Sequence, residues 1–333
     1  MRVLAWRYRR AACLAGFLVI LFAVLSLTEG SVRLSLNQVV NALQPTATDI
    51  SPMIRGIVLD IRLPRTLLAL MTGAGLAVVG TLLQTATRNE LADPFLFGLS
   101  SGASAGAVLV FTRFGDFFGV WTLPAAAFGG GLLSSVAVLS LFQLKRDRGA
   151  ETLIICGLAI SFLFGALTSY LIFAGDQRTA SSVLFWSLGG LGLARWDNLG
   201  FALGGLLLLA AFCLLRWRSL DGLLAGDRTA FSLGINVTRL RTEIFLCCAF
   251  STAIFVSLTG VIGFVGLMVP HLCRHFSAIK HARLLPLCAL VGACLLCGGD
   301  LVSRVLVAPQ ELPIGIITAG IGGLFIVVMV ARR

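Results

Sequence analysis

The sequence predicts an all-α integral membrane protein with about ten transmembrane helices and both termini in the cytoplasm. Three observations support this. The 333-residue chain is 58% hydrophobic and only 12% charged, with a mean hydropathy of +0.97, whereas soluble domains carry about 25% charged residues. Its apolar residues fall into ten segments, most of them of the length that a bilayer requires. Its positive charges collect in every second connection between these segments.

The ten segments leave few residues for a soluble domain, so we expect one transmembrane domain over residues 1–333. The first follows MRVLAWRYRR and resembles a signal peptide, but no clean cleavage site follows it, so we expect a retained helix. Residues 241–276 would form a helix of about 54 Å, longer than the membrane core of about 30 Å, so two helices should turn near Thr259 and Gly260. The predicted spans are 11–28, 66–85, 97–112, 118–142, 151–174, 197–216, 241–258, 260–276, 284–304 and 313–331.

The basic residues predict which way the chain crosses the membrane. Ten spans place both termini on one side, and the connections on that side hold 18 of the 26 lysines and arginines. The positive-inside rule therefore places the termini in the cytoplasm. The net charge of +11 thus predicts topology and not a nucleic-acid surface, which would be a basic face with interleaved aromatic residues. The eight cations of the opposite side are Arg33, Arg55, Arg62, Arg65, Arg113, Arg178, Arg195 and Arg304.

Several functions that a membrane protein can have lack their usual residues. No phosphate-binding loop occurs, and neither Lys145 nor Lys280 follows a glycine, so we expect no ATP or other cofactor on this chain. Asp300 is the only acid well inside an apolar segment, and we expect it to pair with Arg304 four residues later. An ion-gradient carrier, the alternative, needs more intramembrane charge. The nine cysteines, an odd number within or beside apolar segments, predict packing and not a disulfide framework.

A His-x-Cys-x-His triplet ends the eighth predicted span. On a helix His271 and His275 share one face, while Cys273 points about 160° away, so these three side chains do not form a tetrahedral metal site unless the helix breaks. We therefore expect no metal here, and a membrane enzyme built on this triplet is a further alternative that helix geometry disfavours. The simpler interpretation is that Pro270 bends the helix and that the polar residues mark its end at the interface.

Two features favour a transport function. The spans are rich in glycine and small residues, and the stretches 92–98 (ADPFLFG) and 311–315 (ELPIG) break them. Irregular backbone at membrane depth is tolerated beside protein or a water-filled path. The residues Asp93, Pro94, Gly98, Ser100 and Ser101 are therefore candidates for lining a translocation pathway.

The second feature is the longest cytoplasmic connection, residues 218–241. Apolar and polar residues interleave in it, and Gly226 and Gly234 bracket a short helical stretch that begins at Asp227. This pattern predicts a helix that docks into a groove of another protein. A helix lying on the lipid surface is the alternative.

Four stretches carry a resemblance to a known family. These are RLPRTLLALMTGAGLAVVGTLLQTATRNELADPFLFGLSSGASAGA (62–107), AGDRTAFSLGINVTRLR (225–241), VIGFVGLMVPHLCRHF (261–276) and DLVSRVLVAPQELPIG (300–315). Together they resemble the permease subunits of bacterial iron-siderophore, haem and cobalamin importers, the type II ABC importers. The resemblance covers nearly the whole chain. Glu90 stands where the family commonly has proline, which puts in doubt only the local turn.

The resemblance implies the partners and the sites. Two permease copies, identical or homologous, would assemble with two ATPase subunits that bind ATP and Mg²⁺ and with a periplasmic substrate-binding protein. Arg62, Arg65 and Arg304 match positions that form salt bridges to carboxylates of the binding protein; anchoring at the membrane interface is the alternative for each. The coupling pattern for the ATPase falls on Gly226, Asp227, Ala230, Leu233 and Gly234.

The resemblance also implies the activity. We expect a transport subunit of the bacterial inner membrane, not itself an enzyme, that carries a ferric siderophore or another iron chelate from periplasm to cytoplasm by alternating access. Import of haem or cobalamin is the alternative within the family.

Overall fold

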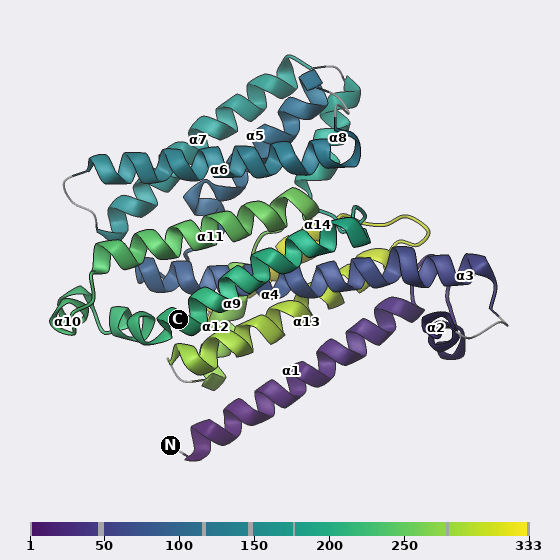
Figure 1. The fold of residues 1–333 in the computed structure, drawn as a ribbon, viewed down its shortest axis with the longest axis horizontal. Coiled ribbons are helices and arrows are strands. Elements are labelled where there is room, and N and C mark those ends of the chain that lie inside the picture. Colours follow the sequence, from purple (N-terminus) through teal and green to yellow (C-terminus); the bar gives the residue numbers. More distant parts are fainter. Residues whose placement is uncertain are drawn as a thin grey trace.

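A computed structural model describes residues 2–45, 50–114, 118–145, 149–175, 177–277 and 280–331. The described chain is a bundle of long helices that run between two ends (Figure 1). The elements, with η for 3₁₀ and π turns, are α1 (Arg2–Thr28), α2 (Leu36–Leu43), α3 (Pro52–Gly56), η1 (Ile57–Arg62), α4 (Leu63–Thr87), η2 (Pro94–Phe97), α5 (Leu99–Leu109), η3 (Val110–Phe114), η4 (Gly119–Trp121), α6 (Thr122–Leu144), α7 (Ala150–Phe173), α8 (Gln177–Ser187), α9 (Trp196–Leu224), α10 (Asp227–Ser232), α11 (Val237–Thr259), α12 (Val265–Ser277), α13 (His281–Val305) and α14 (Ile314–Ala331).

Each of the ten predicted spans has its own helix, namely α1, α4, α5, α6, α7, α9, α11, α12, α13 and α14. The turn expected near Thr259 and Gly260 is confirmed, because α11 ends at Thr259 and Gly260 has a φ of 65°. By length and composition, eight helical stretches of the described residues could cross a membrane. The helices α5 and α12 fall short of this, with 11 and 13 residues.

The two short helices correct the predicted spans 97–112 and 260–276. The 3₁₀ turn η2 and Gly98, with a φ of 76°, precede α5, so regular helix begins only at Leu99. Residues 260–264 are not helical, and α12 begins at Val265. The glycines adopt a left-handed backbone that a residue with a Cβ atom rarely takes, which is why the helix breaks at these points.

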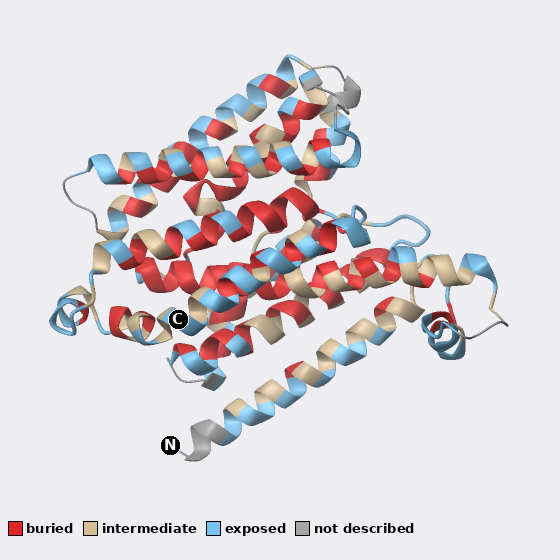
Figure 2. Cartoon of the chain, viewed as in Figure 1, coloured by how far each residue is buried: buried red, intermediate tan, exposed pale blue. Residues whose placement is uncertain are grey.

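The centre of the bundle is α4, which is buried along most of its length (Figure 2). Two glycines allow its neighbours to approach closely: a Cβ atom on Gly73 would overlap the backbone of Gly292 in α13, and one on Gly80 would overlap that of Gly266 in α12. Small residues permit such backbone contacts between membrane helices. The helix α4 therefore packs with its backbone directly against those of α12 and α13.

The two ends of the bundle differ in charge and in content. Both termini lie at the end that carries α10, which we call the inner end, and α2, α3 and α8 lie at the opposite, outer end (Figure 1). The expectation that both termini share one side is thus met, and the positive-inside rule makes the inner end cytoplasmic. Four of the inner cations, Arg146, Arg148, Arg332 and Arg333, lie outside the described residues.

The short outer helices were not expected. The helix α2 begins with a capping box in which the side chain of Ser35 accepts from the backbone of Gln38 and the side chain of Gln38 accepts from the backbone of Ser35. This motif is visible in the sequence as Ser-x-x-Gln and stabilises a helix start. A search for membrane spans does not predict α2, because the long apolar segments dominate the hydrophobic pattern of the sequence.

Candidate docking and coupling sites

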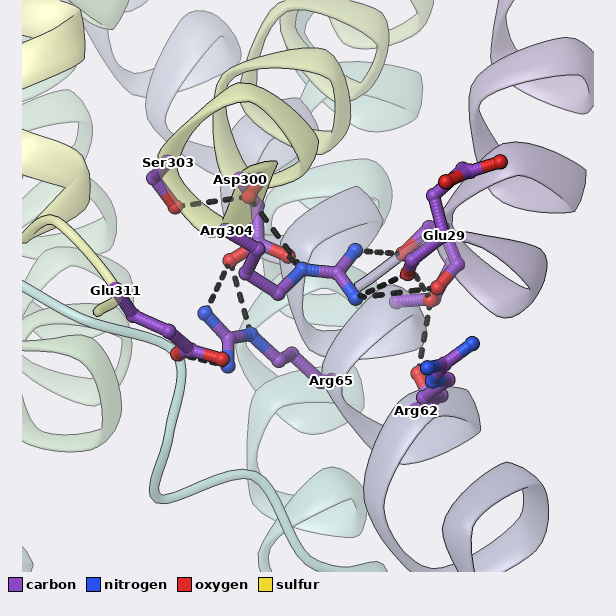
Figure 3. A network of polar contacts seen from close by, with 9 residues as sticks. Glu29, Arg62, Arg65, Asp300, Ser303, Arg304 and Glu311 are labelled. Carbon is purple, nitrogen blue, oxygen red and sulfur yellow. Dashed lines mark hydrogen bonds and ion pairs between the residues drawn. The ribbon is translucent and has the colours of Figure 1, made fainter. Parts of the chain in front are cut away.

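Arg65 joins two carboxylates at the outer end of α4 (Figure 3). Its Nε and Nη2 atoms each lie 2.9 Å from Oδ1 of Asp300, and its Nη1 lies 2.7 Å from Oε2 of Glu311. The Arg65 and Asp300 side chains are 11% and 1% exposed, whereas that of Glu311 is 43% exposed. Arg65 is therefore a largely buried cation, and one of its two partners reaches the surface.

Arg304 shares Asp300 and turns toward α1 (Figure 3). Its Nε lies 3.0 Å from Oδ2 of Asp300, which confirms the predicted pair four residues apart on α13. Its Nη1 donates to the carbonyl oxygens of Ser26 and Glu29 at 3.2 and 3.3 Å, and its Nη2 donates to the hydroxyl of Ser26 at 2.6 Å. That hydroxyl also bonds Thr66 of α4 at 2.7 Å. Arg304 thus ties α13 and α4 to the last turn of α1.

Arg62 binds the same end of α1. Its Nη1 donates to the carbonyl oxygens of Leu27 and Thr28 at 2.7 and 2.9 Å, and its Nη2 donates to the carbonyl of Val32. The last carbonyls of a helix lack partners within the helix. Arg62 and Arg304 supply partners for these groups, and both side chains are buried.

The structure therefore brings the three predicted docking arginines into one cluster but gives them different surroundings. Arg62 and Arg304 direct their hydrogen-bond donors to groups of this chain. Of the three, Arg65 alone is paired with an exposed side chain of the described residues. Contact of these arginines with a binding protein stays a prediction, and Glu311, which the sequence did not mark, belongs to the same cluster.

The predicted coupling segment forms a short helix at the inner end. The helix α10 begins at Asp227 as expected, between Gly226 with a φ of 111° and Gly234 with a φ of 76°. The segment is shorter than the predicted 218–241 because α9 continues to Leu224, where buried Leu220 and Leu223 extend its apolar side.

Two large apolar side chains of this segment reach the surface. Phe231 and Leu233 are 78% and 65% exposed, while Ala230, the residue before Phe231, is buried. Exposed apolar residues grouped in this way mark surfaces for protein or membrane contact.

Two polar links connect this segment to the inner end of α4. The carboxylate of Asp227 accepts from Nη2 of Arg241 at 2.9 Å, and Nε of Arg241 donates to the carbonyl oxygen of Ala86 at 2.9 Å. Arg241 is buried and lies on α11. One buried guanidinium therefore bridges α10 and the last turn of α4.

The second link starts at Asp221, in the last turn of α9. The carboxylate of Asp221 accepts from the backbone N–H of His281 at 2.8 Å and lies 2.7 Å from its Nδ1, and Nε2 of His281 lies 2.8 Å from the hydroxyl of Thr85. His281 is fully buried at the start of α13. In the sequence Arg241 is one of many cytoplasmic cations, and nothing marks His281 or Asp221, because their partners lie far away in the chain.

The five predicted pathway residues surround the break between α4 and α5. The side chain of Asp93 accepts from the backbone N–H of Phe95 at 3.0 Å, and the hydroxyl of Ser101 donates to the carbonyl of Gly98 at 3.0 Å. Pro94 and Ser100 are buried. Asp93 lines a cavity of about 410 Å³, which also touches Phe264 and Gly315 at the other broken segments, whereas the other four predicted residues do not line it.

Comparison with known proteins places this geometry in a family. A family model described as the FecCD transport family matches residues 18–332. The chain belongs to the FecCD transport family.

Individual FecCD relatives match almost end to end. The hemin transport system permease protein HmuU of Yersinia pestis is 37% identical over 324 residues, which cover 96% of this chain and 95% of the relative. The Fe(3+) dicitrate transport system permease protein FecD of Escherichia coli K12 is 37% identical over 279 residues, with 83% and 85% covered. A solved inward-facing conformation of a metal-chelate type ABC transporter has a TM-score of 0.84 at 32% identity and covers 98% of this chain and 100% of that one.

Membership of the FecCD family confirms the resemblance carried by the four motifs. This FecCD chain is a multi-pass membrane protein and a permease subunit of an ABC importer. The inner end with α10 and the outer end with the arginine cluster are thus the two ends of a transport protein.

The His-x-Cys-x-His triplet of this FecCD permease lies on an unbroken helix, α12. His271 and His275 line one cavity of about 390 Å³ together with Phe325, and Cys273 is buried away from it. The shared face predicted for the two histidines is confirmed. Glu90, the departure from the family pattern, lies 3.6 Å from Nδ1 of His271, so this carboxylate pairs with the end of α12.

Proposed function

We propose that this permease carries a ferric siderophore or another iron chelate from the periplasm to the cytoplasm, driven by ATP hydrolysis on separate ATPase subunits. The observation that supports it most is the match to a permease named for ferric dicitrate, over 83% of this chain, together with the match in fold to a transporter of the metal-chelate type, over 98% of it. Import of haem, which the name of another relative gives, or of cobalamin by the same mechanism is the alternative. An ion-gradient carrier is disfavoured, because such proteins use intramembrane charges and Asp300, the only acid well inside an apolar segment of the sequence, is paired with Arg304.

The outer cluster is proposed as the docking site of a periplasmic substrate-binding protein. Arg65 is the cation that an acidic side chain of that protein reaches, since its partner Glu311 is exposed. Arg62 and Arg304 act beside it by holding α1, α4 and α13 in place. The burial of Arg62 and Arg304 supports a role in positioning these helices within the proposed docking site.

The inner segment is proposed as the coupling helix. Phe231 and Leu233 enter a groove of the ATPase subunit, Gly226 and Gly234 permit the turns at either side of α10, and Asp227 and Ala230 fix the helix to the permease. ATP and Mg²⁺ belong to the two ATPase subunits. Closure of the ATPases moves α10, and the links to α4 carry this movement into the bundle, as in other rigid-body transport cycles.

The assembly is proposed to contain a second permease copy, either identical or homologous, in the bacterial inner membrane. The helix α14 supports this, because half of its residues are exposed in the single chain, only Ile314, Thr318 and Gly322 are buried, and it borders both cavities described above. The pathway residues around Asp93 and Gly98 would then face the space between the two copies.

Uptake by whole cells tests the proposed cargo. Cells that lack this permease are compared with cells in which it is restored, using labelled ferric siderophores, ferric citrate, haem and cobalamin. We expect restored uptake of one iron chelate, to the level of the parent strain, and no change with haem or cobalamin. If the restored permease returned uptake of haem or cobalamin alone, the proposed cargo would be wrong and the proposed mechanism would stand. Cells with an empty vector give the background uptake.

A further inference from the structure

The guanidinium of Arg65 divides its donors between a buried and an exposed acid. Its Nε and Nη2 point to Asp300, which is buried beneath it, and its Nη1 points to Glu311 (Figure 3). A guanidinium offers its donors in a fixed planar fork, so each edge accepts its own carboxylate. The edge toward Asp300 faces a carboxylate of α13 that is 1% exposed, whereas Nη1 faces the carboxylate of Glu311, which is 43% exposed.

Glu311 is placed so that it can leave this edge. It lies in the connection between α13 and α14, where residues 306–311 are all exposed. The next residue is fixed, because the backbone N–H of Leu312 donates to the carbonyl of Ser303 at 2.9 Å. In the described part of the chain the carboxylate of Glu311 is held by Arg65 alone. Its side chain can therefore swing out while the backbone bond of Leu312 remains.

A third acid cannot simply be added at this edge of Arg65. Nη1 of Arg65 already lies 2.7 Å from Oε2 of Glu311, so a further carboxylate brought to Nη1 would lie against Glu311 and meet its repulsion. Arg304 and Arg62 offer no free edge, because they bond α1 and Asp300. A docking carboxylate must consequently replace Glu311.

We propose that Glu311 is an internal competitor that occupies the position on Arg65 taken by an acidic side chain of the substrate-binding protein during docking. This inference rests on the docking function proposed above. Docking then exchanges one carboxylate for another, so that the largely buried Arg65 is never left with an open edge, which would be costly for a desolvated cation. The partner side chain is an aspartate or glutamate, and Glu311 sets how tightly it binds.

The affinity of the binding protein for the permease–ATPase complex in lipid nanodiscs tests this competition. Glu311→Gln removes the competing charge, and we expect docking to tighten about three- to tenfold, with most of the gain in a slower dissociation. The matched control is Asp197→Asn, which removes the same charge at the same end of the protein from an exposed carboxylate in the first turn of α9. This control should change the affinity less than twofold or so, by general electrostatics alone.

A second variant separates the inference from the function on which it rests. If Arg65→Gln leaves docking at full strength, the proposed docking site is wrong. If Arg65→Gln weakens docking but Glu311→Gln behaves as Asp197→Asn does, docking on Arg65 stands and the competition is overturned. The competition also requires that Glu311→Gln no longer tightens docking once Arg65→Gln is present. Gel filtration of each complex checks that the assembly is intact.

Discussion

Arg241→Ala is expected to lower substrate uptake about tenfold or more while the ATPase subunits stay bound and continue to hydrolyse ATP. Arg241 is the buried cation between Asp227 of α10 and the carbonyl of Ala86 at the end of α4. A hydrogen bond to a charged group contributes about 1.5–3 kcal/mol, and about 1.4 kcal/mol corresponds to a factor of ten. Without this link, α10 loses its hydrogen-bonded connection to the last turn of α4. Transport and ATP hydrolysis measured together in proteoliposomes give the number of substrates moved per ATP.

Arg239→Ala is the control for this prediction. Arg239 lies two residues away on the same helix, is largely exposed, and pairs with Glu243 four residues later. Such surface pairs contribute about 0–1 kcal/mol, so this variant should retain normal coupling. If Arg241→Ala also transports the normal number of substrates per ATP, the assigned route from α10 to α4 is contradicted.

Asp300→Ala is expected to destabilise the permease by about 3–5 kcal/mol, the usual cost of removing one member of a buried charge network. Asp300 is 1% exposed and faces both Arg65 and Arg304. Its removal leaves Arg304 without a carboxylate and Arg65 with only Glu311, and α1 loses part of its attachment. The melting temperature in detergent and the folded yield from membranes measure this loss.

Two further variants identify the cause of that loss. Glu29→Gln removes an acid from an exposed pair and should leave the melting temperature almost unchanged. Adding Arg304→Met to Asp300→Ala removes the unpaired charge and should recover part of the stability, although the carbonyls of Ser26 and Glu29 lose a donor. A melting temperature of Asp300→Ala equal to that of the unchanged protein would show that the buried network does not hold the outer end together.

The helices and their direction could be predicted because the signals are local. Each long apolar segment needs only its own residues to form a membrane helix, and Gly226 and Gly234 mark the turns around α10 without reference to the rest of the chain. Gly98 and Gly260 likewise carry the left-handed turns at which helices break. The predicted spans still ran through residues 97–98 and 260–264, because apolar composition does not distinguish helix from irregular backbone that packs inside the protein.

The roles of the polar residues depended on partners that lie far away in the sequence. Arg65 meets Asp300 across 235 positions, and Arg241 meets Ala86 across 155. No periodicity records such pairs. The resemblance predicted that Arg62, Arg65 and Arg304 lie at the outer end. Only the folded chain shows that Arg62 donates to carbonyl groups at the end of α1 and that Arg304 donates to both α1 and Asp300. Similarly, a cytoplasmic arginine such as Arg241 looks the same in the sequence whether it is solvated or buried.

Reconstituted transport tests most directly that this chain is an ATP-driven importer of a metal chelate. The permease and its ATPase are placed in liposomes, the loaded binding protein is added at the outer end, and entry of a radioactive ferric siderophore is followed. We expect uptake only when ATP, the ATPase and the binding protein are all present, and none with an ATPase variant that cannot hydrolyse ATP. Uptake that proceeds without ATP and follows an imposed ion gradient would contradict this mechanism.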